Sequence, residues 1–367
     1  MIKKIKQWGG TIKRYENMHP VLIILWSVCI TLLVTAFVGL GIYFYHIQQG
    51  ERQTYVQFID KEFEKEIQKK LKKKYITIAE LKDITELEIE GNSQLTNISD
   101  LEKLPNLTSI TIRNCAISNI DVLKKMDRLQ VLDLTGNKII DLTPLTECYT
   151  LKELFLSNNQ IIDITPLYNL NGLRKLEVQH NNIGLIQSGI KEMSALSYIN
   201  IAENRLVSID AFGNMAQLVY LYAGSNKLSV TPQLHYMEDL KILDLSNNAF
   251  QQLGKLGELP SLQELNIYDN HLEGLEVLES CPNLVKLNLS YNDFSSLEGI
   301  LQCEKLEYLD LRATQIENVK ILEKLSNFNS IYVDDRFDRS QLDFMIGNFR
   351  NGDIKTKQYL LKKQYNL

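Results

Sequence analysis

The sequence predicts an α/β solenoid of stacked repeats that follows one transmembrane helix. Two observations predict this fold class. From Leu107 onward the pattern L-x-x-L-x-L-x-x-N-x-[IL] returns almost every 22 residues, and residues 21–45 carry no charged side chain. A fixed period of about 20 to 29 residues with this spacing is typical of repeats that stack and bury one continuous core between neighbouring coils.

Residues 21–45 are interpreted as a membrane anchor. This stretch of 25 uncharged residues, at about 1.5 Å per residue, is long enough to cross a hydrocarbon core of about 30 Å. Trp26 lies near one end and Tyr43 and Tyr45 at the other, as in the aromatic belts of membrane interfaces. Because the stretch is longer than the apolar part of a signal peptide, we expect an uncleaved single span.

The charges beside the anchor predict its orientation. The tail at residues 1–20 holds four lysines and one arginine against a single glutamate, whereas the first 15 residues after Tyr45 hold one arginine against two acids. An excess of Lys and Arg marks the cytoplasmic side of a span. We therefore expect a single-pass protein of the cell membrane, with its N-terminus in the cytoplasm and its repeats outside.

The repeats, residues 84–333, each predict one short strand and one turn segment. Leu132 and Leu134 alternate with outward-facing neighbours, which indicates half-buried parallel strands on the concave face. Apolar residues three apart, such as Leu142 and Leu145, suit 3₁₀ turns on the convex face. An asparagine after each strand can donate and accept hydrogen bonds in a stacked ladder. Its copies are Asn137, Asn159, Asn181, Asn204, Asn226, Asn248, Asn270 and Asn292, with Cys115 and Thr314 in the terminal copies.

The polar residues around the turns narrow the type of repeat. The strings Asp141-Leu-Thr-Pro-Leu145 and Asp163-Ile-Thr-Pro-Leu167 follow the asparagine element directly. They resemble the 22-residue leucine-rich repeat of the bacterial internalin-like family. This resemblance implies a surface-displayed solenoid that opens with a helical cap, which we assign to residues 56–83 after a juxtamembrane linker at 46–55.

Residues 334–367 are predicted to form a second helical cap, because the open edge of a solenoid needs cover. The sequence has no sorting motif of the Leu-Pro-x-Thr-Gly kind, and we expect neither an immunoglobulin-like domain nor a cleavable leader. A role in host-cell invasion is therefore not expected to carry over from the family.

No combination of residues indicates catalysis, a metal site or a cofactor. The five histidines do not cluster in the sequence, and C-x-x-C, nucleophile and phosphate-loop motifs are missing from it. Residues 76–333 hold 34 acids against 20 Lys and Arg, which argues against a nucleic-acid partner. Cys281 and Cys303 occupy one column of neighbouring coils, so a reduced pair and a disulfide both stay open.

The outward-facing strand positions predict a protein-binding surface on the concave face. Most of these positions are polar, for example Thr111, Asn200, Asn266 and Ser290. In the middle coils a continuous apolar and aromatic strip is expected at Phe155, Tyr198, Tyr220, Tyr222 and Ile242. Its expected extension is Tyr268, Tyr291, Tyr308 and Tyr332. The alternative is that these tyrosines only favour strands and protect the sheet.

Acidic residues beside this strip would favour a basic partner. Those nearest to it are Glu153, Glu177, Asp244 and Glu264. Together with Asp133 and Asp310, they are expected to form a solvated face rather than an acid–base pair.

The sequence thus predicts a membrane-anchored, extracytoplasmic protein that binds a protein partner on its concave face and is not an enzyme. The alternative is a non-catalytic subunit or spacer of a cell-envelope complex, recruited through the span at residues 21–45. A membrane-tethered enzyme is a third reading, disfavoured by the missing site. The identity of the partner and the oligomeric state stay open at this point.

Overall fold

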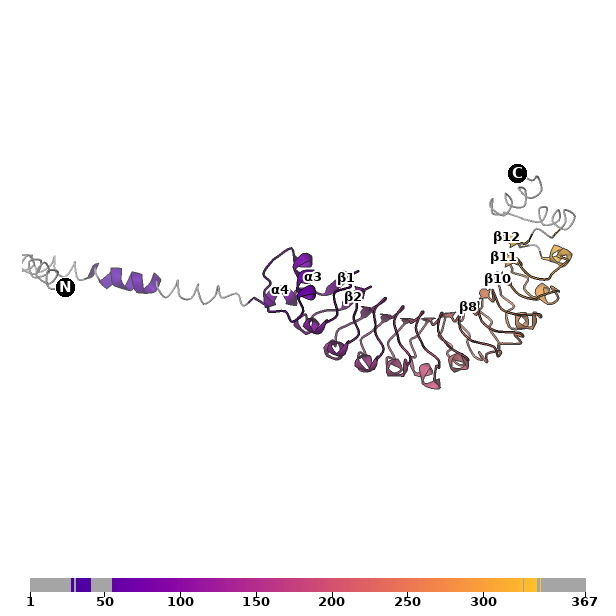
Figure 1. The fold of residues 1–367 in the computed structure, drawn as a ribbon, viewed down its shortest axis with the longest axis horizontal. Coiled ribbons are helices and arrows are strands. Elements are labelled where there is room, and N and C mark those ends of the chain that lie inside the picture. Colours follow the sequence, from indigo (N-terminus) through magenta and orange to yellow (C-terminus); the bar gives the residue numbers. More distant parts are fainter. Residues whose placement is uncertain (1–27, 30, 41–54, 326, 335–336, 338–367) are drawn as a thin grey trace, which may run out of the picture. The chain divides into compact units, whose positions relative to one another are not determined.

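The computed structural model describes residues 28–29, 31–40, 55–325, 327–334 and 337. The chain divides into two units, Met1–Val56 and Gln57–Leu367, and each is considered by itself (Figure 1). The predicted tail at 1–20, most of the linker at 46–55 and most of the C-terminal cap at 334–367 lie outside the described residues.

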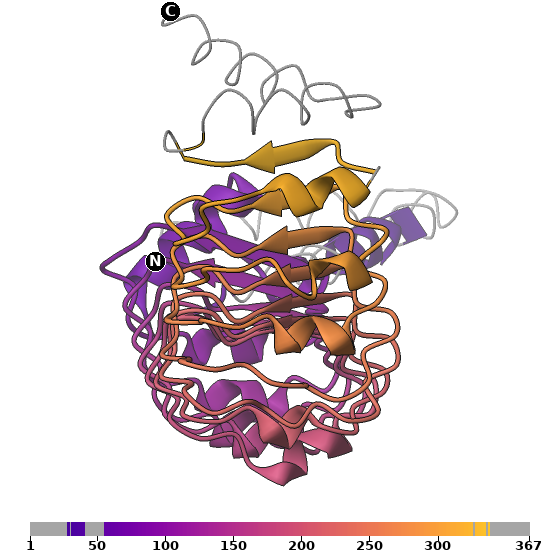
Figure 2. The same ribbon diagram turned by 90° about the vertical axis from the view of Figure 1, so that its right-hand side faces the viewer.

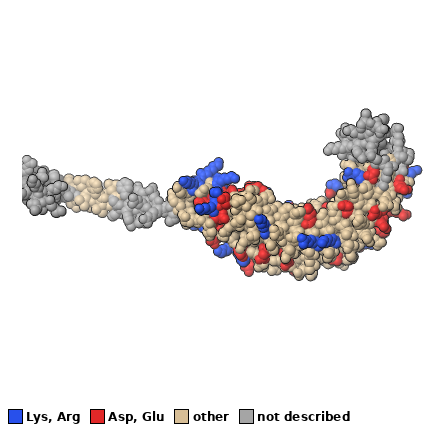
Figure 3. Space-filling model, in the orientation of Figure 1, with Lys and Arg blue, Asp and Glu red and all other residues tan. Residues whose placement is uncertain are grey.

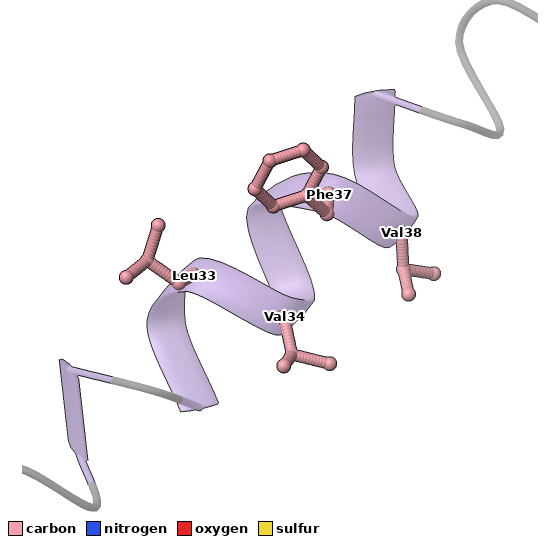
Figure 4. Close-up of a pocket in the computed structure, with 4 residues that line it drawn as sticks. All are labelled: Leu33, Val34, Phe37 and Val38. Carbon is pink, nitrogen blue, oxygen red and sulfur yellow. The ribbon is translucent and has the colours of Figure 1, made fainter. Parts of the chain in front are cut away.

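In the first unit, residues 31–40 are helical. Their apolar side chains are exposed, and Figure 4 shows Leu33, Val34, Phe37 and Val38 projecting from the helix. The Thr35 hydroxyl donates to the Thr31 carbonyl at 2.9 Å, so this polar group is satisfied within the helix. Within the described part of the chain, no helix has the length and apolar character needed to cross a membrane.

The second unit is built on one sheet of 12 parallel strands in sequence order. Each strand pairs with the strand one repeat later, for example Leu132 with Leu154, which confirms the predicted solenoid of short parallel strands. The strands are β1 (Glu86–Glu90), β2 (Ser109–Arg113), β3 (Val131–Asp133), β4 (Glu153–Phe155), β5 (Lys175–Glu177), β6 (Tyr198–Asn200), β7 (Tyr220–Tyr222), β8 (Ile242–Asp244), β9 (Glu264–Asn266), β10 (Lys286–Asn288), β11 (Tyr308–Asp310) and β12 (Ser330–Tyr332).

The back of the coils is formed by 3₁₀ helices, as the three-residue spacing predicts. Figure 1 shows the strands on the concave side of this unit and the short helices on its convex side. Leu142 and Leu145 at one such turn are fully buried. The helices are η1 (Ser99–Lys103), η2 (Asp121–Lys125), η3 (Thr143–Leu145), η4 (Thr165–Leu167), η5 (Ser188–Glu192), η6 (Asp210–Phe212), η7 (Glu276–Ser280), η8 (Ile300–Gln302) and η9 (Lys320–Lys324).

The asparagine ladder has the predicted hydrogen bonds. The Asn181 Oδ1 atom accepts from the Ile161 amide at 2.9 Å. Its Nδ2 atom donates to the carbonyls of Leu156 and Val178, both at 3.0 Å. Each asparagine thus connects its own bend to the preceding coil. In the terminal copies the Cys115 thiol donates to the Arg113 carbonyl and the Thr314 hydroxyl donates to the Leu311 carbonyl.

The residue before each ladder position adopts a left-handed backbone. Asn158, His180 and Glu203 have φ of 56°, 58° and 54°, whereas Gly136 has φ of 71° without a side-chain penalty. This conformation turns the chain sharply at the end of every strand. All strands therefore end on the same flank of the unit (Figure 2).

Two helices precede the first strand within the predicted N-terminal cap, α3 (Lys61–Leu71) and α4 (Ile78–Lys82). Phe63 and Ile67 of α3 are fully buried. The Asp60 side chain accepts from the amides of Glu62 and Phe63, as an N-cap does. Lysines gather at this end of the unit (Figure 3).

Three strand-face positions that were expected to face solvent are buried. Asp133 and Asp310 are 3% and 0% exposed, and Ser290 is 1% exposed. Each of the two buried aspartates is paired with an arginine: Arg113 lies 2.6 Å from Asp133 and Arg312 lies 2.5 Å from Asp310. The Ser290 hydroxyl donates to the Asn288 side chain at 2.6 Å.

Candidate protein-binding surface

The aromatic residues of the middle coils meet on the concave face. Tyr198, Tyr220 and Ile242 occupy one register position of β6, β7 and β8. The Tyr198 ring lies 5.8 Å from that of Tyr220 and 5.5 Å from that of Tyr222. All four side chains are half-buried. We call Phe155, Tyr198, Tyr220, Tyr222 and Ile242 the aromatic cluster.

A lysine that the sequence analysis did not single out joins the cluster. The Lys175 Nζ atom lies 4.9 Å from the Phe155 ring centre and 4.7 Å from that of Tyr198. It also pairs with Glu177 at 2.9 Å. Lys175 is the first residue of β5 and pairs with Tyr198, the first residue of β6. Its position in the repeat could therefore have identified it as a neighbour of the cluster. Its ammonium links two aromatic side chains by cation–π contacts.

The four acids beside the cluster fall into two groups. Glu177 is neutralised by Lys175, and Glu264 lies 2.5 Å from the Lys286 ammonium. Asp244 accepts from the Ser246 amide and hydroxyl at 2.8 and 2.6 Å and from the Asn266 side chain at 3.1 Å. Glu153 is exposed. Glu177 and Glu264 each belong to an ion pair with no net charge, so these two of the four predicted acids attract a basic partner less than a free carboxylate would.

The aromatic surface is interrupted between the aromatic cluster and the tyrosines that were predicted to extend it. Between Ile242 and Tyr308 the same column holds Glu264 and Lys286, which form the ion pair described above. The remaining tyrosines form two separate ring pairs. These are Tyr268 with Tyr291 at 5.1 Å and Tyr308 with Tyr332 at 5.3 Å.

A shallow groove of about 210 Å³ borders the aromatic cluster. Tyr222 and Ile242 line one end of it and Tyr308 the other. Its remaining outward side chains are polar, namely Asp244, Glu264, Asn266, Lys286 and Asn288. The middle of the concave face thus combines an apolar cluster with a polar groove, which is the composition of many protein interfaces.

The hydroxyls of Tyr198 and Tyr222 stay neutral at physiological pH. Burial raises the pKa of Tyr198, and the nearby Glu177 carboxylate raises it further. Burial likewise raises the pKa of Tyr222. These side chains therefore offer uncharged hydroxyl groups and ring faces to a partner.

The described residues contain no group of three or more His, Cys, Asp or Glu side chains that could hold a metal ion. Cys281 and Cys303 are free thiols, fully buried, with the Cys303 Sγ atom 3.9 Å from the Cys281 carbonyl. Burial raises the pKa of Cys303 to about 11 and also raises that of Cys281. Both thiols are therefore protonated and poorly reactive.

Comparison with known proteins agrees with this architecture. Residues 106–352 match the family described as "Leucine-rich repeat region". No curated protein matches the chain. Among solved structures, an internalin (inlF) from Listeria monocytogenes is 22% identical over 82% of this chain and 92% of its own, with a TM-score of 0.65.

Two further structures share the fold. A leucine-rich repeat protein from Leptospira interrogans is 22% identical over 74% of this chain and 84% of its own, with a TM-score of 0.53. The plant peptide hormone receptor RGFR1, solved in complex with RGF2, is 22% identical over 76% of this chain and 57% of its own, with a TM-score of 0.50. The family match spans more than half of the sequence, and the chain belongs to the leucine-rich repeat family.

Proposed function

We propose that this protein is a membrane-anchored, non-catalytic binding protein whose repeats lie outside the cytoplasm and capture a protein partner on the concave face. Leucine-rich repeat proteins are generally protein-interaction domains, and the RGFR1 structure holds a peptide hormone on the same fold. The acidic repeat segment disfavours nucleic acid as the partner.

The observation that carries this proposal is the aromatic cluster. Tyr198, Tyr220 and Tyr222 hold one another in ring contact while remaining half-exposed. Tyrosine is enriched among interface hot spots, because its ring buries a large area at a small entropic cost. Contiguous apolar surface on a soluble domain usually serves binding. Asp244 and Glu153, the acids without a lysine partner in the described residues, favour basic groups on the partner.

The double variant Tyr220→Ala with Tyr222→Ala should abolish partner capture. Truncating a hot-spot tyrosine costs about 2 kcal/mol or more of binding free energy, so two together should weaken binding by at least about a thousandfold. The measurement is recovery of the partner from intact cells by crosslinking and mass spectrometry, followed by titration of the purified partner.

The matched control removes the same chemistry elsewhere. Tyr149 and Tyr236 are 59% and 70% exposed and lie outside the strands. Tyr149→Ala with Tyr236→Ala should leave capture unchanged. The aromatic cluster would not be the binding site if the Tyr220 and Tyr222 variant bound the partner normally. The same conclusion would follow if this variant unfolded at a lower temperature than the control, because the loss of binding would then reflect a loss of structure.

The anchor at residues 21–45 is the second part of the proposal. Leu32, Leu33 and Phe37 are 64%, 57% and 72% exposed, and lipid would cover them. Protease added to intact protoplasts should therefore degrade the repeats, because the basic tail predicts a cytoplasmic N-terminus. Digestion that requires lysis of the cells would reverse the proposed orientation.

The same exposed helix also fits a role in which the span recruits other membrane subunits. Exchanging residues 21–45 for an unrelated transmembrane segment separates the two functions. Capture that survives the exchange supports binding by the concave face. Capture that is lost supports the spacer role.

A further inference from the structure

Five exposed lysines gather where the helix α3 ends. We call them the cap lysines: Lys69, Lys70, Lys72, Lys73 and Lys74. No acidic residue lies between Glu66 and Glu80 in the chain, although the repeats that follow hold more acids than bases. Figure 3 shows their positive charge at the end of the unit where α3 lies.

The bend after α3 keeps these lysines together. Lys72 has a left-handed backbone with φ of 53°. The Lys73 amide donates to the Gln68 carbonyl at 3.1 Å, which closes the helix as a Schellman motif. The chain then turns back, and the Gln68 side chain donates to the Lys74 carbonyl at 2.9 Å. The backbone of Lys74 therefore lies beside the last turn of the helix.

Most of this positive charge is not neutralised within the protein. Two cap lysines have an acidic partner: Lys69 lies 3.8 Å from Glu66, and Lys73 pairs with Glu80. Within the part of the chain that the structure describes, the other three form no ion pair. The helix dipole favours lysines in the last turn of a helix, but its effect fades beyond that turn. It does not account for the three cap lysines that follow α3.

Apolar side chains border the cap lysines. Tyr75 and Ile78 are 59% and 53% exposed. The Lys74 ammonium lies 5.4 Å from the Tyr75 ring centre. Lys73 reaches Glu80 of α4, so the turn that carries Ile78 stays next to the lysines. Aromatic and aliphatic side chains among lysines are typical of surfaces that lie in the headgroup region of a membrane.

We propose that the cap lysines, with Tyr75 and Ile78, dock this end of the repeat unit on anionic lipid headgroups of the membrane in which the chain is anchored. The ammonium groups bind headgroup phosphates, and the two apolar side chains enter between the headgroups. This inference rests on the proposed function, because the anchor at residues 21–45 brings the cap lysines to that membrane. The 15 residues between Tyr45 and Lys61 span about 55 Å at most, so the cap lysines stay near its surface.

The position of the cap lysines favours a lipid surface over a soluble polyanion. The helices α3 and α4 precede β1 at one end of the stacked coils (Figure 1). A membrane can contact this end without approaching the acidic repeats, whereas a long soluble polyanion would also meet their carboxylates and be repelled. Exposed Tyr75 and Ile78 strengthen contact with lipid but add little to the binding of a phosphate chain in water.

Docking of the cap would set the height at which a partner is captured. The strand β7, which carries two tyrosines of the aromatic cluster, is the sixth strand after β1. Neighbouring strands are about 4.8 Å apart, so about 30 Å of stacked strands separate the two. A repeat unit that stands on its cap would hold the aromatic cluster at that distance beyond the headgroups.

Fluorescence quenching of the full-length protein in vesicles tests the docking. Cys29, which is exposed, is replaced by serine, and Ala79→Cys carries a fluorophore on the exposed side of α4. The vesicles contain a lipid with a nitroxide on its headgroup. Equal amounts of phosphatidylcholine and phosphatidylglycerol should give strong quenching, and phosphatidylcholine alone should give little. Salt at 1 M should remove the quenching, because it shortens the Debye length to about 3 Å.

Charge reversal at the three unpaired cap lysines is the decisive variant. Each lysine near an anionic surface strengthens binding about fivefold. Lys70→Glu with Lys72→Glu and Lys74→Glu should therefore lower the quenching in anionic vesicles to the value in neutral ones. Tyr75→Ala with Ile78→Ala should lower it in part. An unchanged circular dichroism spectrum would show that both variants are folded.

The matched control makes the same change of charge away from the cap. Lys138, Lys191 and Lys241 are exposed lysines of the repeats, and none of them forms an ion pair within the described residues. Their combined replacement by glutamate should leave the quenching unchanged.

Three results would overturn the proposal. Equal quenching in neutral and anionic vesicles would mean that charge does not hold the cap on lipid. Full quenching of the triple cap variant would mean that other residues make the contact. Tighter binding of soluble polyphosphate than of anionic vesicles, measured at equal phosphate concentration, would identify a soluble polyanion as the occupant.

Flotation with vesicles separates a failure of the docking from a failure of the anchor. A chain that floats with neutral vesicles but is not quenched in anionic ones keeps its anchor and lacks the docking surface. A chain that floats only with anionic vesicles, and loses this in the triple cap variant, has the docking surface but lacks the anchor.

Discussion

Asn181→Ala is expected to lower the free energy of unfolding of the repeat unit by about 3 kcal/mol, because it leaves several buried backbone groups without partners. The alanine cannot accept from the Ile161 amide or donate to the carbonyls of Leu156 and Val178. Only part of this loss can be offset by water, since Asn181 is 8% exposed.

Urea unfolding measures this effect, and Asn182→Ala is the matched control. Asn182 is half-buried, and no side-chain hydrogen bond of it is found in the described residues. Its replacement should change stability by no more than about 0.5 kcal/mol. Amide exchange at Ile161 should accelerate in the Asn181 variant alone. Equal stability of the two variants would mean that the ladder does not hold the coils together.

The fold was predictable because every coil packs its apolar residues in the same way, so the same residue pattern returns in each repeat. Leucine spacing assigns the strand, the ladder asparagine fixes the bend, and the three-residue spacing assigns the 3₁₀ turn. An error in one coil would put its apolar residues into solvent and contradict ten others. The register of Tyr198 against Tyr220 and Ile242 therefore followed from counting alone.

Contacts between side chains of different coils were harder to predict. The alternation of a strand shows that Asp133 and Asp310 leave the core side, but not that they are buried and paired with arginines. The same limit applies to Lys175, whose contacts reach one coil forward and one coil back. A scan of opposite charges about 20 residues apart would have found Arg113 and Asp133.

The aromatic cluster and the groove beside it show how a repeat fold acquires a specific surface. Column positions that face solvent are free of packing constraints, so their side chains can vary from coil to coil. Lysine, tyrosine and isoleucine follow one another in one column at Lys175, Tyr198, Tyr220 and Ile242. Function can therefore change at these positions without a change of fold.

The buried carboxylate of Asp310 makes Arg312 the most sensitive exposed side chain of the last coils. The Arg312 guanidinium contacts both carboxylate oxygens, with Nε 3.0 Å from Oδ1, and lies 5.4 Å from the Tyr332 ring centre. Arg312→Ala would leave a fully buried charge unpaired, and such a loss costs about 3 kcal/mol or more.

Replacing Asp310 should lower the free energy of unfolding less than replacing Arg312 does. The difference between the two variants is the quantity to measure. Asp310→Ala eliminates the buried charge itself, and the freed Arg312, whose side chain is 50% exposed, can turn to water. We therefore expect the Arg312→Ala variant to have a clearly lower free energy of unfolding than the Asp310→Ala variant, as measured by chemical unfolding. Arg174→Ala, an exposed arginine, should match the unmodified protein. The reverse order would mean that the carboxylate is solvated in solution, because only a buried charge makes the arginine indispensable.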